Sequence, residues 1–88
     1  MAARLKIIGL VHGVYFRAGL ATEASQRGVT GWVRNMPDGS VEAHLEGEDD
    51  SVRQVITWAK RGPPRARVDS LKVDKVSPKN LRGFRIEG

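Results

Sequence analysis

Two short segments of the 88-residue chain carry residue types that could bind and hydrolyse a phosphorylated compound. The first, residues 9–17, reads GLVHGVYFR: an apolar stretch that breaks at a glycine and ends in an arginine. The second, residues 31–35, reads GWVRN and ends in an asparagine before a turn. A cation at the mouth of a helix can hold phosphate without a metal, and an amide side chain can hold a water. Together the two segments indicate hydrolysis at phosphorus.

The first segment has the residues of an anion-binding loop. A loop that leads from a strand into a helix presents backbone N–H groups that have no partner within the helix, at the positive end of the helix dipole. Gly13 lets the backbone curl close to an anion, and the planar guanidinium of Arg17 matches two phosphate oxygens. Taken alone, the segment is also compatible with an ordinary surface arginine after a turn.

Asn35 is the second candidate catalytic residue. Asparagine at the end of a strand is most often a turn former, and in isolation that interpretation of Asn35 would be preferred. We expect the strand that carries Asn35 to lie beside the strand that leads into the anion loop. Arg17 and Asn35 would then face one small anion, and the amide could orient a water by accepting from it and donating to it.

The elements that would position these residues follow from the pattern of apolar side chains. Alternation of apolar and polar residues favours strands, and the turn residues 36–39 join two of them as a hairpin. Leu71 and Val73 are in phase on one strand whereas Val76 is out of phase, so we expect a bulge at Val76. The predicted strands span residues 4–11, 30–35, 40–46, 68–76 and 84–86.

Two helices are predicted between these strands. Residues 18–27 are rich in helix formers and are followed by Gly28, a natural helix terminator. The second helix begins at the acidic cap 48–50, carries apolar residues at i, i+3, i+4 and i+7, and ends at the glycine and prolines 62–64. The order β-α-β-β-α-β with a short extra strand predicts one α+β domain over residues 1–88. We expect a ferredoxin-like sandwich, with both helices on one face of an antiparallel sheet.

The two segments resemble the two signature motifs of acylphosphatases, small enzymes with this fold. The first is similar to glycine–x–valine–glutamine–glycine–valine–x–aromatic–arginine, with His12 in place of the usual glutamine. The second is similar to glycine–aromatic–valine–basic–asparagine, followed after three residues by glycine–x–valine. The resemblance covers nearly the whole chain. It implies that a mixed carboxylic–phosphoric anhydride is hydrolysed to a carboxylate and inorganic phosphate.

The resemblance also implies roles for individual residues. Arg17 would bind the substrate phosphate together with the loop amides, and Asn35 would position the attacking water. His12 could be a neutral loop residue, or a protonated one that adds charge to the loop. The residues expected at the substrate are His12, Gly13, Val14, Tyr15, Phe16 and Arg17, with Arg17 and Asn35 catalytic.

The charge of the chain leaves one alternative function. Its 15 basic and 10 acidic residues give a net charge of +5, which attracts anions, including nucleic acids. A basic ferredoxin-like module that binds nucleic acid is therefore the alternative. Arg82-Gly83-Phe84 echoes an RNA-binding strand motif, but the residues that follow lack the aromatic rings that stack bases. We expect no nucleic-acid partner, and instead a small acyl phosphate as substrate, with inorganic phosphate or a similar anion in the loop.

Other classes of site are disfavoured by composition. The chain has no cysteine, which excludes disulfides, thiolate metal sites and cysteine nucleophiles. His12 and His44 are isolated, so no metal site is expected, and His44 should face solvent from its strand. No apolar run approaches the roughly 20 residues of a membrane span, and no secretory signal is visible. We expect a cytoplasmic monomer that uses no metal or cofactor and does not bind membranes. Because Arg17 and Asn35 are both present, a regulatory domain without catalysis is disfavoured.

Overall fold

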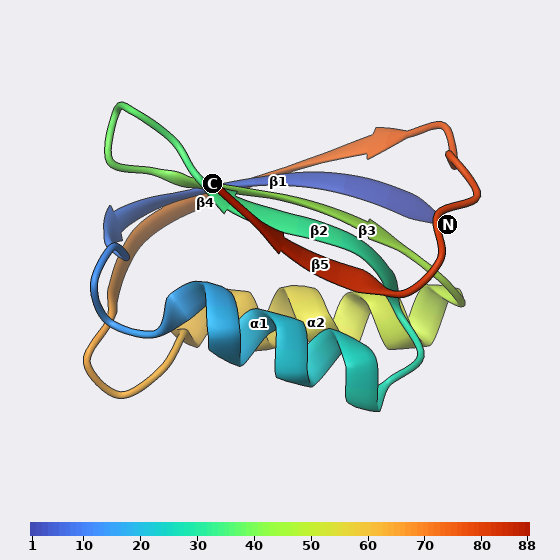
Figure 1. Cartoon of the computed structure of the whole chain (residues 1–88), viewed down its shortest axis with the longest axis horizontal. Coiled ribbons are helices and arrows are strands. Elements are labelled where there is room, and N and C mark those ends of the chain that lie inside the picture. The colour runs from blue at the N-terminus through green and yellow to red at the C-terminus, as the bar shows by residue number, and fades with distance from the viewer.

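The computed structural model describes residues 1–88, in which five strands form one sheet and two helices cover one of its faces (Figure 1). This arrangement confirms the predicted ferredoxin-like α+β sandwich with a short extra strand at the end of the chain. The strands are β1 (Ala2–Leu10), β2 (Thr30–Asn35), β3 (Val41–Glu46), β4 (Arg67–Val76) and β5 (Phe84–Glu87), and the helices are α1 (Phe16–Gln26) and α2 (Asp49–Arg61).

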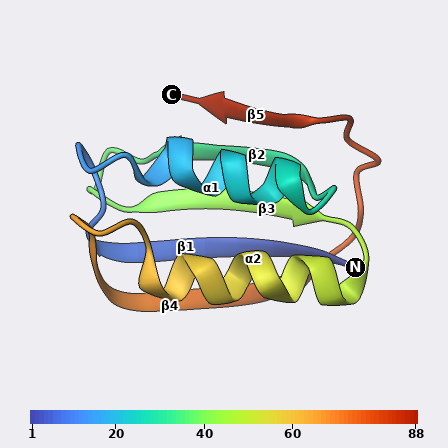
Figure 2. The same ribbon diagram turned by 90° about the horizontal axis from the view of Figure 1, so that it is seen from below.

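The strand order across the sheet is β4-β1-β3-β2-β5 (Figure 2). The prediction that the strand of Asn35 neighbours the strand that leads into the anion loop was wrong, because β3 lies between them. The β1-α1-β2 crossover makes β1 and β2 parallel, and the hairpin then turns β3 back to pair with both. Asn35 pairs with Val41, and Val41 also pairs with Ile7. The C-terminal ends of β1 and β2 therefore lie at the same end of the sheet.

The sequence predicted a wholly antiparallel sheet, but β5 makes the sheet mixed. It pairs parallel with β2, whereas the other three pairings are antiparallel. Residues 77–83 lead from β4 at one edge of the sheet to β5 at the other, passing the end of the sheet where β1 begins (Figure 2). β5 must therefore run opposite to β4, and this direction makes it parallel to β2.

Side chains from the inner face of the sheet and from the two helices form one core. Leu5 and Ile7 of β1 are fully buried, and α2 lies over this face with its apolar stripe turned inward. Burying each Leu, Ile or Val side chain stabilises the fold by roughly 1.5–3 kcal/mol. The spacing predicted for α2 is confirmed: its buried residues are Val52, Val55, Ile56 and Ala59.

The helix ends follow local chemistry, and α1 is shifted from the predicted residues 18–27 at both ends. α1 begins at Phe16, two residues earlier than expected, because the left-handed Tyr15 is its N-cap residue and accepts the first helical hydrogen bond from Gly19. The Phe16 ring is buried and packs 5.5 Å from the ring of Trp58. α2 has acidic residues in its first turn and basic residues in its last, which complements its dipole. Glu48 is the N-cap residue of α2, but its side chain makes no capping hydrogen bond. Neither helix has the length and apolar character needed to cross a membrane.

The predicted bulge at Val76 lies elsewhere. Val76 pairs in register with Ala2, and the pairing of β1 with β4 shifts instead between Ile8 and Gly9, where it skips Asp69. Gly9 has a φ of 146°, and a Cβ at this position would lie 2.1 Å from the carbonyl oxygen of Arg67. Only glycine allows two backbones to approach so closely. The bulge therefore lies where β4 passes Gly9 and not at Val76.

His44 was expected to face solvent, but its side chain is fully buried. It lies on the sheet face away from the helices, where the indole of Trp32 stacks on its ring at 6.1 Å. Its Nε2 is 2.7 Å from Oε2 of Glu46, and the same carboxylate accepts hydrogen bonds from the backbone N–H groups of Lys79 and Leu81. The prediction for His44 failed because the alternation of apolar and polar residues indicates on which face of the sheet a side chain lies. It does not indicate whether other residues cover that face.

Candidate active site

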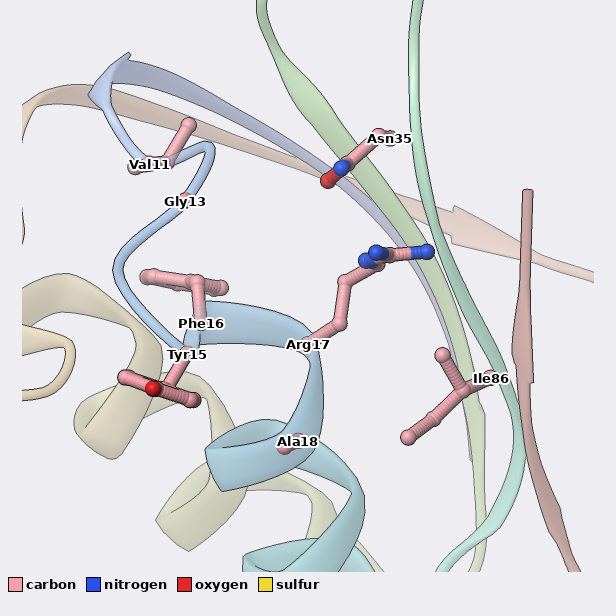
Figure 3. A pocket seen from close by; sticks show the side chains of 8 residues that line it. All are labelled: Val11, Gly13, Tyr15, Phe16, Arg17, Ala18, Asn35 and Ile86. Carbon is pink, nitrogen blue, oxygen red and sulfur yellow. The ribbon is translucent and has the colours of Figure 1, made fainter.

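The loop between β1 and α1 has the backbone geometry of an anion site (Figure 3). Gly13 and Tyr15 are both left-handed, with φ of 70° and 64°. Left-handed residues alternating with ordinary ones turn successive N–H groups toward one side, which makes a concavity for an anion. For Tyr15 this conformation costs about 1–2 kcal/mol, and the burial of the adjacent Phe16 holds it in place.

The N-terminus of α1 adds positive potential at the same place. Its first turn contains no acidic residue, and its N-cap residue Tyr15 makes no side-chain hydrogen bond to the helix. The N–H of Gly19 donates to the Tyr15 carbonyl oxygen at 3.0 Å, so the helix amides that precede Gly19 have no partner within the helix. These free N–H groups and the helix dipole favour an anion at the loop.

Arg17 projects from the first turn of α1 toward the ends of β2 and β5 (Figure 3). Its Nη1 donates to the carbonyl oxygen of Glu87 at 3.0 Å, so the C-terminal strand fixes the direction of the guanidinium. A guanidinium has five N–H donors, and one bond leaves the others for a ligand. The arginine is therefore both held by β5 and able to bind a planar pair of anion oxygens.

Asn35 faces Arg17 from the end of β2, and the two polar groups point into the same space (Figure 3). The Oδ1 atom of Asn35 is buried and has no hydrogen-bond partner. Leaving a buried acceptor unpaired costs about 1–3 kcal/mol, and native proteins rarely do so away from functional sites. A water that donates one hydrogen to Oδ1 would satisfy it.

These residues line one cleft of about 410 Å³. The lining includes one cation and one amide, but no carboxylate and no histidine. Nowhere in the molecule do three or more His, Asp or Glu side chains gather so that they could hold a metal ion. The cleft brings together Gly13, Tyr15, Phe16 and Arg17 from the predicted set with Asn35, and adds Val11, Ala18 and Ile86.

Two residues of the predicted set do not line the cleft. Val14 is buried, and the Nε2 atom of His12 lies 2.8 Å from the carbonyl oxygen of Ser40. Two contributions of β5 were missed by sequence reasoning: the side chain of Ile86 and the carbonyl group of Glu87. No sequence signal could have identified them. Every residue has a backbone carbonyl, and the position of β5 depends on its pairing with β2, which is far away in the sequence.

Comparison with known proteins places the chain in a family. A family model described as Acylphosphatase matches residues 3–86. An acylphosphatase of Thermococcus kodakarensis is 49% identical over 86 residues, which cover 98% of this chain and 94% of that protein. One of Aeropyrum pernix is 51% identical over 86 residues, covering 96% and 85%. The crystal structure of acylphosphatase from Bacillus subtilis matches with a TM-score of 0.95 at 32% identity, covering 99% and 98%.

The chain therefore belongs to the acylphosphatase family. The relatives named above are hydrolases, and family and fold together support acylphosphatase activity. The alternative of a nucleic-acid-binding module is not favoured.

Proposed function

We propose that this acylphosphatase cleaves the carboxyl–phosphate bond of small acyl phosphates with Arg17 and the loop amides as phosphate ligands. Asn35 orients the attacking water. The observation that carries this proposal is the convergence of Arg17 and Asn35, from different elements, on one cleft beside the loop (Figure 3). The unpaired buried Oδ1 of Asn35 gives the water an acceptor.

The chemistry of an acyl phosphate matches these groups. The bond from the water oxygen to phosphorus forms as the bond from phosphorus to the carboxyl oxygen breaks. The carboxylate is a good leaving group, so little help from a general acid is needed. Negative charge on the phosphoryl oxygens is stabilised by the guanidinium and the amides, and the water must lie in line with the breaking bond. The proton of the water passes to a phosphate oxygen of the substrate itself.

The same proposal includes independence from metals and cofactors. The cleft offers a cation and N–H groups to the substrate and no carboxylate that would hold a metal beside it. We also place the protein in the cytoplasm, since a chain without cysteine suits a reducing compartment.

The direct test is hydrolysis of benzoyl phosphate in the presence of EDTA. The wild-type protein should turn over this substrate, and Arg17→Ala should lower kcat/KM by about 10²–10³-fold, the usual effect of removing one positioned donor to a charged transition state. Arg53→Ala, which removes an exposed arginine of α2, is the matched control and should keep full activity. A folded Arg17→Ala variant with full activity would contradict the assignment, as would activity that EDTA abolishes.

Asn35→Ala separates binding from chemistry in the same assay. Because Asn35 is assigned to the water and not to the phosphate, kcat should fall by about 10²-fold while KM and inhibition by inorganic phosphate change little. A variant with unchanged kcat and a raised KM would show that Asn35 binds the phosphate instead.

A further inference from the structure

His12 belongs to the anion loop by sequence, yet its ring is directed at the hairpin turn between β2 and β3. Its Nε2 lies 2.8 Å from the carbonyl oxygen of Ser40, 28 residues along the chain. A carbonyl oxygen can only accept, so Nε2 carries the hydrogen and donates. Ser40 is itself only 4% exposed, so the contact between the two loops is partly buried rather than fully at the surface.

The acceptor that His12 uses is shared with the end of β2. The backbone N–H of Met36 also donates to the Ser40 carbonyl oxygen, at 2.8 Å. Met36 directly follows Asn35. One oxygen, with both its lone pairs in use, thus connects the anion loop to the residue beside the proposed water-binding amide.

The turn that carries this acceptor is fixed from its other side. Oδ1 of Asp38 accepts from the backbone N–H of Ser40 at 2.9 Å and from its hydroxyl at 2.6 Å. Oδ2 of Asp38 lies 3.2 Å from Nζ of Lys6 on β1. Ser40 is consequently a fixed anchor, and a ring bonded to it holds the loop at a set position relative to β2.

We propose that His12 is a positioning residue of the hydrolysis: through the Ser40 carbonyl it sets the anion loop at the distance from Asn35 at which water and phosphorus meet in line. The inference rests on the proposed function. It replaces the expectation that His12 contacts the substrate. Displacing one reacting group by about 1 Å can cost roughly 10²-fold in rate, so a tether between the two groups matters even though it touches neither.

The experiment compares His12→Ala, His12→Gln and His12→Asn with the wild type, using benzoyl phosphate as substrate and inorganic phosphate as inhibitor. His12→Ala should lower kcat by roughly 10–100-fold, with the inhibition constant for phosphate nearly unchanged. His12→Gln should restore most of this loss, because its terminal amide N–H reaches about as far as Nε2. His12→Asn has the same donor on a shorter side chain and should resemble His12→Ala. A phosphate inhibition constant that rises in step with the loss of kcat would overturn the proposal, since His12 would then bind the anion directly.

A double-mutant cycle with Asn35→Ala distinguishes positioning from general support of the fold. If His12 acts by placing the loop relative to Asn35, His12→Ala should have little further effect on kcat once Asn35 is alanine, because interacting sites are not additive. Full additivity of the two losses would overturn the proposal, as would a His12→Gln variant as impaired as His12→Ala. Arg17→Ala reports separately on the proposed function: if Arg17 is required and the cycle is additive, only the tether fails.

Discussion

In the proposed reaction, Arg17 and Asn35 meet different electrostatic demands at one cleft. A transferring phosphoryl group carries negative charge on its outer oxygens, and a guanidinium stabilises this charge. The attacking water needs a neutral group that accepts one of its hydrogens and leaves an oxygen lone pair directed at phosphorus. Arg17 is set by the Glu87 carbonyl, and the buried Oδ1 of Asn35 is left unpaired by the protein. Under the proposed function, Arg17 would therefore serve the phosphoryl group and Asn35 the water.

Asp38 should make the hairpin turn sensitive to acid. The side-chain hydrogen bond from Ser40, its backbone hydrogen bond and the contact with Lys6 lower the pKa of Asp38 from 3.8 to about 2. A carboxylate with a lowered pKa in the folded state stabilises the fold above its ordinary pKa, and this stabilisation is lost as the pH falls from about 4 to about 2.

The measurement is thermal unfolding of the wild type and of Asp38→Asn between pH 2 and pH 5. Asp38→Asn should be less stable than the wild type at pH 5 and should lose less stability on acidification. Asp74→Asn, at an exposed carboxylate of β4, is the control and should keep the wild-type pH dependence. Parallel curves for the wild type and Asp38→Asn would refute this role.

At the scale of elements, β5 contributes more to the site than its four residues suggest. It supplies the carbonyl that orients Arg17 and the side chain of Ile86 in the cleft. Its place depends on the preceding segment, residues 77–83, which the buried carboxylate of Glu46 holds through the N–H groups of Lys79 and Leu81. Burial raises the pKa of Glu46, but the hydrogen bonds from His44 and these two amides outweigh it, and the net pKa is lowered.

Glu46→Gln should therefore loosen β5. The amide nitrogen of glutamine cannot accept, so at least one buried donor loses its partner, at a cost of about 1–3 kcal/mol in the free energy of unfolding. Hydrogen exchange should quicken over residues 77–87 more than in α2. The control is Glu42→Gln on the same strand as Glu46, which removes the charge of the partly exposed partner of Arg34 and should cost about 0–1 kcal/mol. Equal effects of the two variants would argue against a special role for Glu46.

At the scale of the whole molecule, the edge strand β4 bears on the number of chains in solution. An exposed edge can pair with a second copy unless charges prevent it. Lys72 is exposed on β4, and Lys75 lies opposite the buried Ala3, so it is on the helix side of the sheet. If β4 paired with the edge strand of a second copy, the charge of Lys75 on the helix side of the sheet would be buried.

We accordingly expect a monomer. Sedimentation velocity over a range of concentrations should give one species with the mass of a single chain. A variant with Lys72→Thr and Lys75→Thr should associate more strongly, because it removes the charges that oppose pairing along β4. A wild-type dimer that these substitutions do not strengthen would contradict this account of the edge.

Local chemistry determined much of this protein from its sequence alone. Residue types and spacing predicted that Gly13, Arg17 and Asn35 belong to one site, and the three residues line the same cleft. The alternation of apolar and polar residues predicted a strand over residues 40–46, and the apolar side chains of Val41, Ala43 and Leu45 in that strand are fully buried. These features depend on neighbours along the chain, where side-chain period and backbone preference act directly.

The tertiary structure decided what depends on pairing between distant segments. It placed β3 between β1 and β2, ran β5 parallel to β2, and buried His44 against Trp32 and Glu46. It also turned His12 toward Ser40 and put the Glu87 carbonyl against Arg17. Strand pairing uses backbone groups that are alike in every residue. The sequence therefore indicates which segments can form strands, whereas the folded chain determines which strands pair and which side chains each pairing buries.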